Sequence, residues 1–328
     1  MSDTLPGLHR KIERARELRS VVSTMKGLAA ASIGQLEKST RALDDYYRNV
    51  QLGLGACFRA NASAGFSMIE PKTKQGFGLT AAVVFGSDQG LVGQFNEAVV
   101  EYAVEELSAL PGRKRIWAVG ERVHDHLSTT ALPLAGLFVA PLSVNAITAL
   151  VGQILIEILS EVNVHEQVRQ PSAEQRENHG EKQWESRRES VQQLYLFYNS
   201  HKSGPAYTPV SQRLLPLDEA WLHSMTQTPW PTKKIPEVLG NGVKTIRALL
   251  REYLFVSLFR ACAQSLASEN ASRLAAMQRA ERNIDQLRED LQKTFYRLRQ
   301  SKIDEELFDV ISGVEALTRT QQPKHPVD

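Results

Sequence analysis

Residues 284–303 read IDQLREDLQKTFYRLRQSKI, and they lie within a run from Val243 to Thr318 that contains no proline. Apolar side chains recur along this run every three or four residues, which is the pattern of a helix with one apolar face. A helix of roughly 75 residues is about 110 Å long at a rise of 1.5 Å per residue. A helix of that length needs a partner to bury its apolar face. The apolar positions toward its end include Leu287, Leu291, Ile303, Leu307, Val310 and Val314.

The N-terminal end of the chain has the matching pattern. No proline occurs between Leu8 and Phe58, and apolar or small side chains follow one another at alternating steps of four and three, as in a coiled-coil seam. We expect this helix to continue through Gly34 and to fray near Gly53, because each glycine costs about 1 kcal/mol relative to alanine. The two ends therefore predict an antiparallel coiled coil. The predicted seam is Leu18, Val22, Met25, Ala29, Ser32, Leu36, Ser39, Leu43, Tyr46 and Val50.

The middle of the chain has a different pattern, in which short apolar runs alternate with amphipathic ones. The run Leu79–Phe85 is almost wholly apolar, which is typical of a strand buried on both faces. Alternating strands and helices predict a Rossmann-like α/β domain with helices covering its sheet. The predicted strands are 79–85, 115–119, 134–139, 191–198 and 209–215, and the predicted helices are 94–107, 121–127 and 144–162.

These patterns divide the chain into three predicted parts. An N-terminal shaft helix covers residues 1–60, a central α/β domain covers 61–240, and a C-terminal shaft helix with its tail covers 241–328. Within the central domain, residues 165–189 form a polar excursion with charges of both signs. Residues 227–241 contain three prolines and are interpreted as the linker into the second long helix.

Composition limits the classes of function. Of the 328 residues, 42% are hydrophobic and 23% are charged, which suits a soluble globular protein. A formal net charge of +2 is too small to indicate a nucleic-acid partner. No stretch of 18 apolar residues is present, so we predict no membrane-spanning helix. The two cysteines, Cys57 and Cys262, are a poor basis for a disulfide framework or a metal site, and we interpret them as small apolar residues of the core.

Few residues are candidates for chemistry. The loop Gly86–Gly93 follows a predicted strand and precedes a predicted helix, where a phosphate could be held, but its spacing fits neither the dinucleotide fingerprint nor the P-loop. We therefore interpret it as a tight turn. His124 and His126 are two residues apart, so on a helix they point in different directions. We predict no catalytic, cofactor-binding or metal-binding residue.

Four stretches of the sequence match a known family. Residues 265–277 (SLASENASRLAAM) resemble the C-terminal signature of gamma subunits of F-type rotary ATP synthases. Residues 87–96 (SDQGLVGQFN) resemble the family's turn after its first strand, and residues 24–32 resemble its N-terminal helix motif. Residues 299–313 resemble its C-terminal end. Because the matches lie at both ends and in the middle, the resemblance covers the whole chain.

The resemblance implies a function that the patterns do not. In this family the two terminal helices rotate inside a ring of three alpha and three beta subunits, and this rotation couples proton or sodium transport to ATP synthesis or hydrolysis. The α/β domain binds the epsilon subunit and stands on the ring of membrane c subunits. The resemblance therefore implies a non-catalytic subunit, without a cofactor, that is peripheral on the cytoplasmic face of the bacterial inner membrane.

The resemblance also assigns roles to residues near the two ends. Met25 and Lys26 match the position that faces the lever loop of the beta subunits. Glu269 and Arg273 match polar residues of the C-terminal signature that are important for coupling.

A second set of residues lies further along the C-terminal helix. Arg299 and Gln300 match a pair that hydrogen-bonds to a catch loop of the beta subunit, and Asp304 and Glu306 lie beside that pair. Gln89 stands where the family usually has arginine. Such departures, with the polar excursion, suit an alternative bacterial ATPase. Two other readings remain open at this point: a coiled-coil adaptor with an unknown partner, and a nucleotide-binding protein that uses Gly86–Gly93.

Overall fold

The computed structural model describes residues 4–60, 79–163, 191–201, 207–217, 219–234, 236–238 and 242–320. The chain divides into two compact units. One unit, here called the helical unit, comprises Met1–Gly27 and Met277–Asp328, and the other, the α/β unit, comprises Leu28–Ala276. The predicted polar excursion at 165–189 lies outside the described residues.

Both ends of the chain are helical, as predicted. Helix α1 covers Leu5–Ala60 and helix α6 covers Gly242–Thr320. In the helical unit Arg19 contacts Asp285, with 2.7 Å between Nε and Oδ1. In the α/β unit Arg260 contacts Asp44, with 3.1 Å between Nη2 and Oδ1. A second contact in each unit, Lys26 with Glu281 and Tyr46 with Glu252, joins a later residue of α1 to an earlier residue of α6. The two helices therefore run antiparallel within each unit, as predicted.

The inner face of α1 differs from the predicted seam at two positions. Leu18 is 57% exposed, and the buried residues in its part of the helix are Leu8 and Ala15. Tyr46 is exposed, and its neighbour Tyr47 faces the core instead. The buried residues Leu8, Ala15, Ala29, Leu36 and Val50 keep the seven-residue spacing. The prediction was wrong at the other two positions because the next residue along, Arg19 or Tyr47, contacts α6, at Asp285 or Tyr253.

The end of α1 also differs from the prediction. The helix does not fray near Gly53 but continues to Ala60, because a helix that the sequence did not predict packs against it. This helix, α5, covers Glu219–Gln227. A side chain at Gly55 would place its Cβ 2.4 Å from the carbonyl oxygen of Met225 on α5. Arg59 donates from Nη1 to the carbonyl oxygens of Thr226 and Thr228, at 2.7 and 3.1 Å.

The α/β unit is built on a five-stranded sheet. Its strands are β1 Leu79–Phe85, β2 Arg113–Val119, β3 Leu134–Phe138, β4 Val191–His201 and β5 Tyr207–Leu215. They lie in the order β3-β2-β1-β4-β5, with the first four parallel and β5 antiparallel to β4. The predicted Rossmann-like mixed sheet is therefore present, and each predicted strand is found within two or three residues of its predicted bounds.

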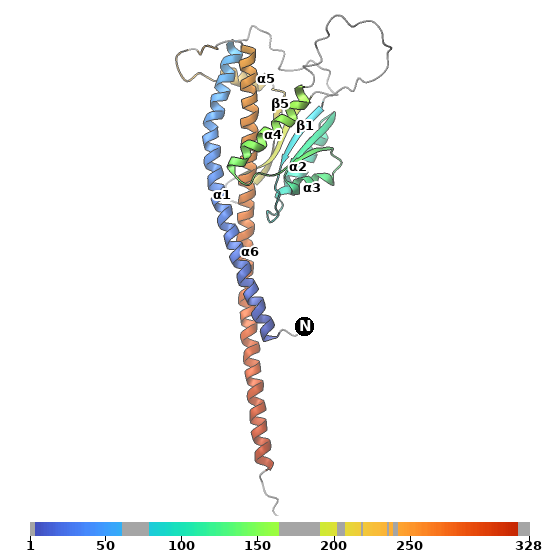
Figure 1. The fold of residues 1–328 in the computed structure, drawn as a ribbon, viewed down its shortest axis with the longest axis vertical. Helices are drawn as coiled ribbons and strands as arrows, with labels where there is room; N and C mark the ends of the chain where they lie inside the picture. The colour runs from blue at the N-terminus through green and yellow to red at the C-terminus, as the bar shows by residue number, and fades with distance from the viewer. Residues whose placement is uncertain are drawn as a thin grey trace, which may run out of the picture. The chain divides into compact units, whose positions relative to one another are not determined.

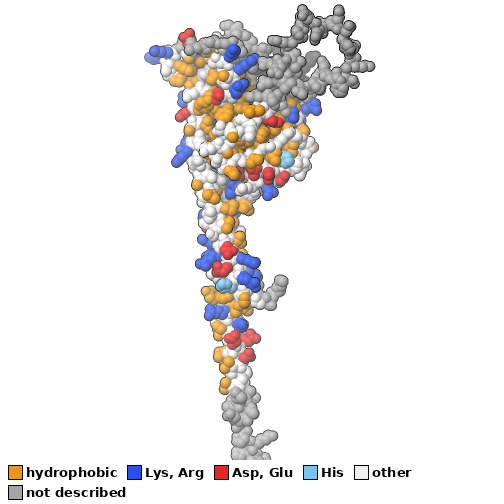
Figure 2. Space-filling model, viewed as in Figure 1, with side chains coloured by type: hydrophobic (Ala, Val, Ile, Leu, Met, Phe, Trp, Pro, Cys, Tyr) orange, Lys and Arg blue, Asp and Glu red, His pale blue; other side chains and the backbone are white. Residues whose placement is uncertain are grey.

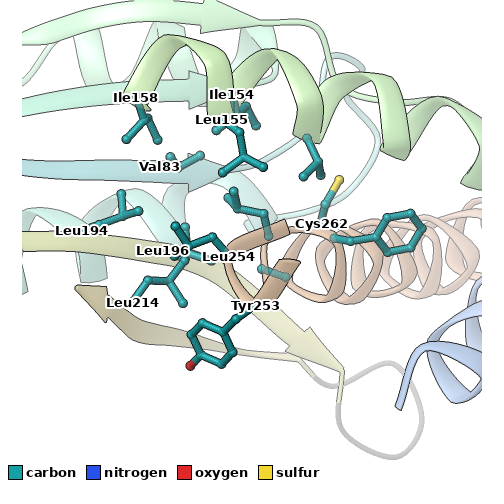
Figure 3. Close-up of a cluster of buried hydrophobic side chains, with 14 of the residues drawn as sticks. Val83, Ile154, Leu155, Ile158, Leu194, Leu196, Leu214, Tyr253, Leu254 and Cys262 are labelled. Atoms are coloured by element: carbon teal, nitrogen blue, oxygen red, sulfur yellow. The ribbon is translucent and has the colours of Figure 1, made fainter. Parts of the chain in front are cut away.

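Both faces of this sheet are covered (Figure 1), and alternate residues of β1 point to opposite faces. Ala82 and Val84 pack against α2 (Phe95–Ala109) and α3 (Glu121–Ser128). Val83 belongs to the larger core that includes α4 (Val144–Asn163) and the parts of α1 and α6 in this unit. Figure 3 shows Ile154, Leu155 and Ile158 of α4 directed toward Val83. The sheet is therefore buried on both faces, as the nearly continuous apolar run of β1 predicts.

Candidate functional site

The residues assigned to contact other subunits differ in their surroundings. In the helical unit, Lys26 is already paired within the chain, with 2.5 Å between its Nζ and Oε2 of Glu281. Arg19 lies 3.8 Å from Oε1 of the same Glu281 and also contacts Asp285, whose hydrogen bond and charge raise the pKa of Arg19. Met25, beside Lys26, is half-buried. These charges link α1 to α6 in addition to any contact with a partner.

The second predicted pair, Glu269 and Arg273, lies in the interior of the α/β unit. Glu269 is 5% exposed, and its Oε1 accepts a 2.6 Å hydrogen bond from Nη2 of Arg273. Burial raises the pKa of the Glu269 carboxyl, Arg273 opposes that shift, and the charge of Asp88 adds to it. Sequence reasoning did not find that this part of the signature is buried, because a helix with polar residues usually exposes them.

The loop after β1 is a tight turn held by hydrogen bonds. Asn96 accepts from the backbone N–H of Ser87 at 3.0 Å, and the N–H of Gly86 donates to the carbonyl of Val119 at 2.8 Å. A side chain at Gly86 would lie 2.3 Å from Val123, so the position requires glycine. The N–H groups of Gly86 and Ser87, the first two of the loop, are therefore used within the chain, which agrees with the tight-turn interpretation.

Asp88 in this turn joins three loops at the carboxyl edge of the sheet. Its Oδ1 accepts from the N–H of Glu121 at the start of α3, at 2.9 Å. Its Oδ2 accepts from the N–H of Ala140 after β3, at 3.0 Å. A carboxylate at a helix N-terminus is also favoured by the helix dipole. The loops after β1, β2 and β3 are thus held by one side chain.

Two serines of α6 attach the helix to the same edge of the sheet. Ser268 donates from Oγ to the carbonyl of Asn199 in β4 at 2.8 Å, and Ser272 donates to the carbonyl of Val92 at 2.5 Å. Asn199 in turn donates from Nδ2 to the carbonyl of Phe95 at the start of α2, at 2.8 Å. The sequence analysis missed these serines, and their only signal is polar residues inside an otherwise apolar helical stretch.

The remaining predicted residues lie on the exposed part of α6. Arg299, Gln300, Asp304 and Glu306 are all exposed to solvent. Gln300 donates from Nε2 to Oδ1 of Asp304 at 2.9 Å, one turn along the helix. The structure therefore places these four residues together on one segment of the helical unit, with their side chains accessible.

Apolar side chains are exposed on this same segment. At 100° per residue they fall on one face of the helix, and those from residue 303 onward are 45–63% exposed. Figure 2 shows such side chains open to solvent along this part of the molecule. The apolar face of this helix was expected to need a partner helix, but α1, with 56 residues, cannot cover all 79 residues of α6. This apolar stripe consists of Tyr296, Ile303, Leu307, Val310, Ile311 and Val314.

Other candidates have ordinary surroundings. Cys57 and Cys262 are buried in the core of the α/β unit, as interpreted, and burial raises the pKa of both thiols. Nε2 of His126 lies 3.6 Å from Oε1 of Glu97 on α2. Among the described residues, no group of three or more histidine, cysteine or acidic side chains is arranged to hold a metal ion. Within the same residues, no helix is both long and apolar enough to cross a membrane.

Comparison with known proteins identifies the family. The profile of a family described as ATP synthase matches residues 4–317, so the chain belongs to the ATP synthase family. Curated relatives along its full length are ATP synthase gamma chains. The gamma chain of Granulibacter bethesdensis is 26% identical, over 96% of this chain and 99% of the relative. The gamma chain of Pelagibacter ubique is also 26% identical, with the same coverage. The resemblance drawn from the four sequence stretches is thereby confirmed, and the adaptor alternative is not favoured.

A solved structure has the same fold. A chain in the mitochondrial ATP synthase of Euglena gracilis, in a structure of its OSCP, F1 and c-ring, aligns with a TM-score of 0.59 at 14% identity. The alignment covers 99% of this chain and 98% of that one. At this identity the likeness concerns the fold, and it agrees with paired terminal helices around a central mixed sheet.

Proposed function

We propose that this chain is the central-stalk rotor subunit of an F-type ATP synthase, and that its rotation couples ion flow through a membrane ring to ATP synthesis or hydrolysis. It carries no catalytic site of its own in this proposal. Its partners are three alpha and three beta subunits, an epsilon subunit and the ring of c subunits. The complex would be attached to the cytoplasmic face of a bacterial inner membrane.

The observation that supports this proposal is the apolar stripe on α6. Soluble proteins seldom leave a row of large apolar side chains exposed, and such a row on a helix is typical of a surface that enters an apolar groove. Arg299 and Glu306 flank one edge of the stripe and Asp304 flanks the other, given the helical repeat of 100° per residue. A polar border around an apolar centre is the usual arrangement of a protein interface.

The exposed charges suit a shaft that must turn within its partners. An ion pair at an exposed surface contributes roughly 0–1 kcal/mol, so it can be broken and formed again at each step. Arg299, Gln300, Asp304 and Glu306 are exposed and can make such contacts. In this proposal they meet the catch loop of a beta subunit, whereas Met25 and Lys26 face its lever loop. Lys26 would then exchange its pairing with Glu281 for a partner residue.

Reconstitution tests the proposal. This chain is mixed with purified alpha and beta subunits of the same organism, and complex size and ATP hydrolysis are measured. The proposal predicts a complex of three alpha, three beta and one copy of this chain that is fully active only when the chain is present. A chain that stays apart from alpha and beta and leaves hydrolysis unchanged would contradict it.

A matched pair of variants tests the stripe itself. Leu307→Asp places a charge within the stripe, and Ile156→Asp places one on an exposed apolar residue of α4, which is 72% exposed. Both changes are on the surface, where substitutions usually alter stability by less than about 0.5 kcal/mol. We expect Leu307→Asp to prevent or weaken assembly and Ile156→Asp to leave it intact. Equal assembly by both variants would show that the stripe does not enter the alpha–beta ring.

A further inference from the structure

The segment of α6 from Ser268 to Arg273 carries an unusual concentration of buried polar groups. Ser268 is fully buried, Glu269 is 5% exposed and Ser272 is 6% exposed. Burying polar groups is unfavourable unless they are hydrogen-bonded, and all three make the contacts described above. Their partners lie at the carboxyl edge of the sheet or, for Glu269, one turn along the same helix.

We propose that this contact, here called the α6 junction (Ser268, Glu269, Ser272 and Arg273), is where turning force passes between α6 and the sheet with its loops. Glu269 and Ser272 are then positioning residues inside the rotor and do not themselves bind a beta subunit. This inference rests on the proposed function, because it concerns a chain that rotates. It differs from the role that the resemblance gave to Glu269 and Arg273 by naming their contacts as internal.

The connections of the junction support this assignment. Ser272 holds the loop after β1 through Val92, and Ser268 holds the end of β4 through Asn199. Glu269 lines a small cavity together with Gly86 and Ala140. Gly86 begins the loop after β1 that contains Asp88, and Ala140 lies in the loop after β3 that Asp88 binds. A segment of under two helical turns thus reaches the carboxyl ends of the four parallel strands or the loops that follow them.

Much of the other contact between α6 and the sheet is apolar. Leu254, Leu258 and Leu266 belong to the apolar core shared with the sheet and α4. The hydrophobic effect is not directional, so apolar packing fixes the position of a helix along its axis less sharply than hydrogen bonds do. Hydrogen bonds depend strongly on angle and distance, so the serine contacts specify one axial and rotational position. Resistance to slipping is therefore concentrated at the junction.

Two variants with matched controls test the inference. Ser272→Ala removes one hydrogen bond and Glu269→Gln removes one charge, while Ser108→Ala and Glu105→Gln make the same changes on the exposed side of α2. In the isolated chain, hydrogen–deuterium exchange of residues 86–94 is expected to rise about fivefold in Ser272→Ala, which loses the bond to Val92, the factor for one lost buried hydrogen bond. The controls are expected to leave it unchanged.

The same four variants are then assembled with their partner subunits in membrane vesicles. We expect the junction variants to hydrolyse ATP at the control rate but to pump fewer ions per ATP, because α6 slips against the sheet. Faster exchange without any loss of pumping would overturn the inference, as would unchanged exchange. If the unaltered chain fails to activate ATP hydrolysis by the alpha and beta subunits, the proposed function itself is contradicted. Normal coupling by the unaltered chain and by both junction variants overturns only the inference.

A reversible cross-link at the junction tests the same inference if those variants fold poorly. A Cβ built at Gly93 lies 3.9 Å from Oγ of Ser272, so cysteines at the two positions would be neighbours that a local shift can join. A side chain at Gly93 is strained because φ there is +62°, and the control with Gly93→Cys alone carries the same strain. In the chain with Gly93→Cys and Ser272→Cys, pumping per ATP should be low when the thiols are reduced and recover when they are oxidised, with Gly93→Cys alone as the control. Equal coupling in the two redox states would contradict the inference.

Discussion

Two glycines of α1 should respond in opposite ways to the same substitution. Gly34→Ala adds a Cβ that meets no atom within 4 Å, so the change improves helix propensity without a clash and should stabilise the chain by about 0.5–1 kcal/mol. Gly55→Ala offers the same gain but places its Cβ 2.4 Å from the carbonyl oxygen of Met225. Because that atom is backbone, α5 must move away, and overpacking of this kind costs about 1–3 kcal/mol.

The displacement should also weaken the bonds that Arg59 donates to Thr226 and Thr228 at the end of α5. Together these effects should make Gly55→Ala destabilising by about 1–2 kcal/mol, after the gain in helix propensity is subtracted. Urea unfolding of the isolated chain, followed by far-UV circular dichroism, measures both variants against the unaltered protein. If Gly55→Ala raised the midpoint as Gly34→Ala does, the contact between α1 and α5 would be absent and the reasoning refuted.

Three further results are expected. Arg299→Ala or Gln300→Ala should impair the activation of ATP hydrolysis in the reconstituted complex while leaving thermal unfolding of the isolated chain unchanged, because both residues are exposed. Cys57 and Cys262 should fail to react with a thiol reagent in the native chain and should both react in urea, since burial shields them and raises the pKa of each. The raised pKa of Glu269 means that the folded state holds that proton more tightly than the unfolded state, so as pH rises above about 4.5 the group should cost stability. The free energy of unfolding of Glu269→Gln, compared with that of the unaltered chain, should therefore increase from acid to neutral pH. A difference that does not change with pH would contradict a raised pKa at Glu269.

The parts of the fold that were predictable are those with strong local patterns. The run Leu79–Phe85 is apolar except for Thr80 and is bounded by glycines, and it forms β1 with those bounds. The long helices could be predicted because their apolar spacing persists over many turns and no proline interrupts it. In these stretches local preference and final packing agree, which is the condition under which sequence reasoning succeeds.

The parts that were not predictable depend on contacts between distant residues. Gly53 and Gly55 suggest a weak helix end when read alone, yet α5 lies against Gly55 and keeps the helix intact. The short helix α5 has only 9 residues and stands between prolines, so its pattern is too brief to distinguish from a loop. The position of Tyr47 rather than Tyr46 on the inner face likewise follows from the partner helix and not from the local repeat.

The candidate residues illustrate a further limit, because matching a motif does not show which way its side chains point. Glu269 and Arg273 came from one signature, with a role in coupling, and Arg299 and Gln300 from another, with a contact to a beta-subunit loop. The first pair is buried against the sheet, whereas the second is exposed beside an apolar stripe. A rotor needs both kinds of residue, since force taken up at an exposed surface must cross an internal contact to reach the rest of the chain. A substitution at Glu269 should therefore alter the rotor before it meets any partner, and one at Arg299 should act only after assembly.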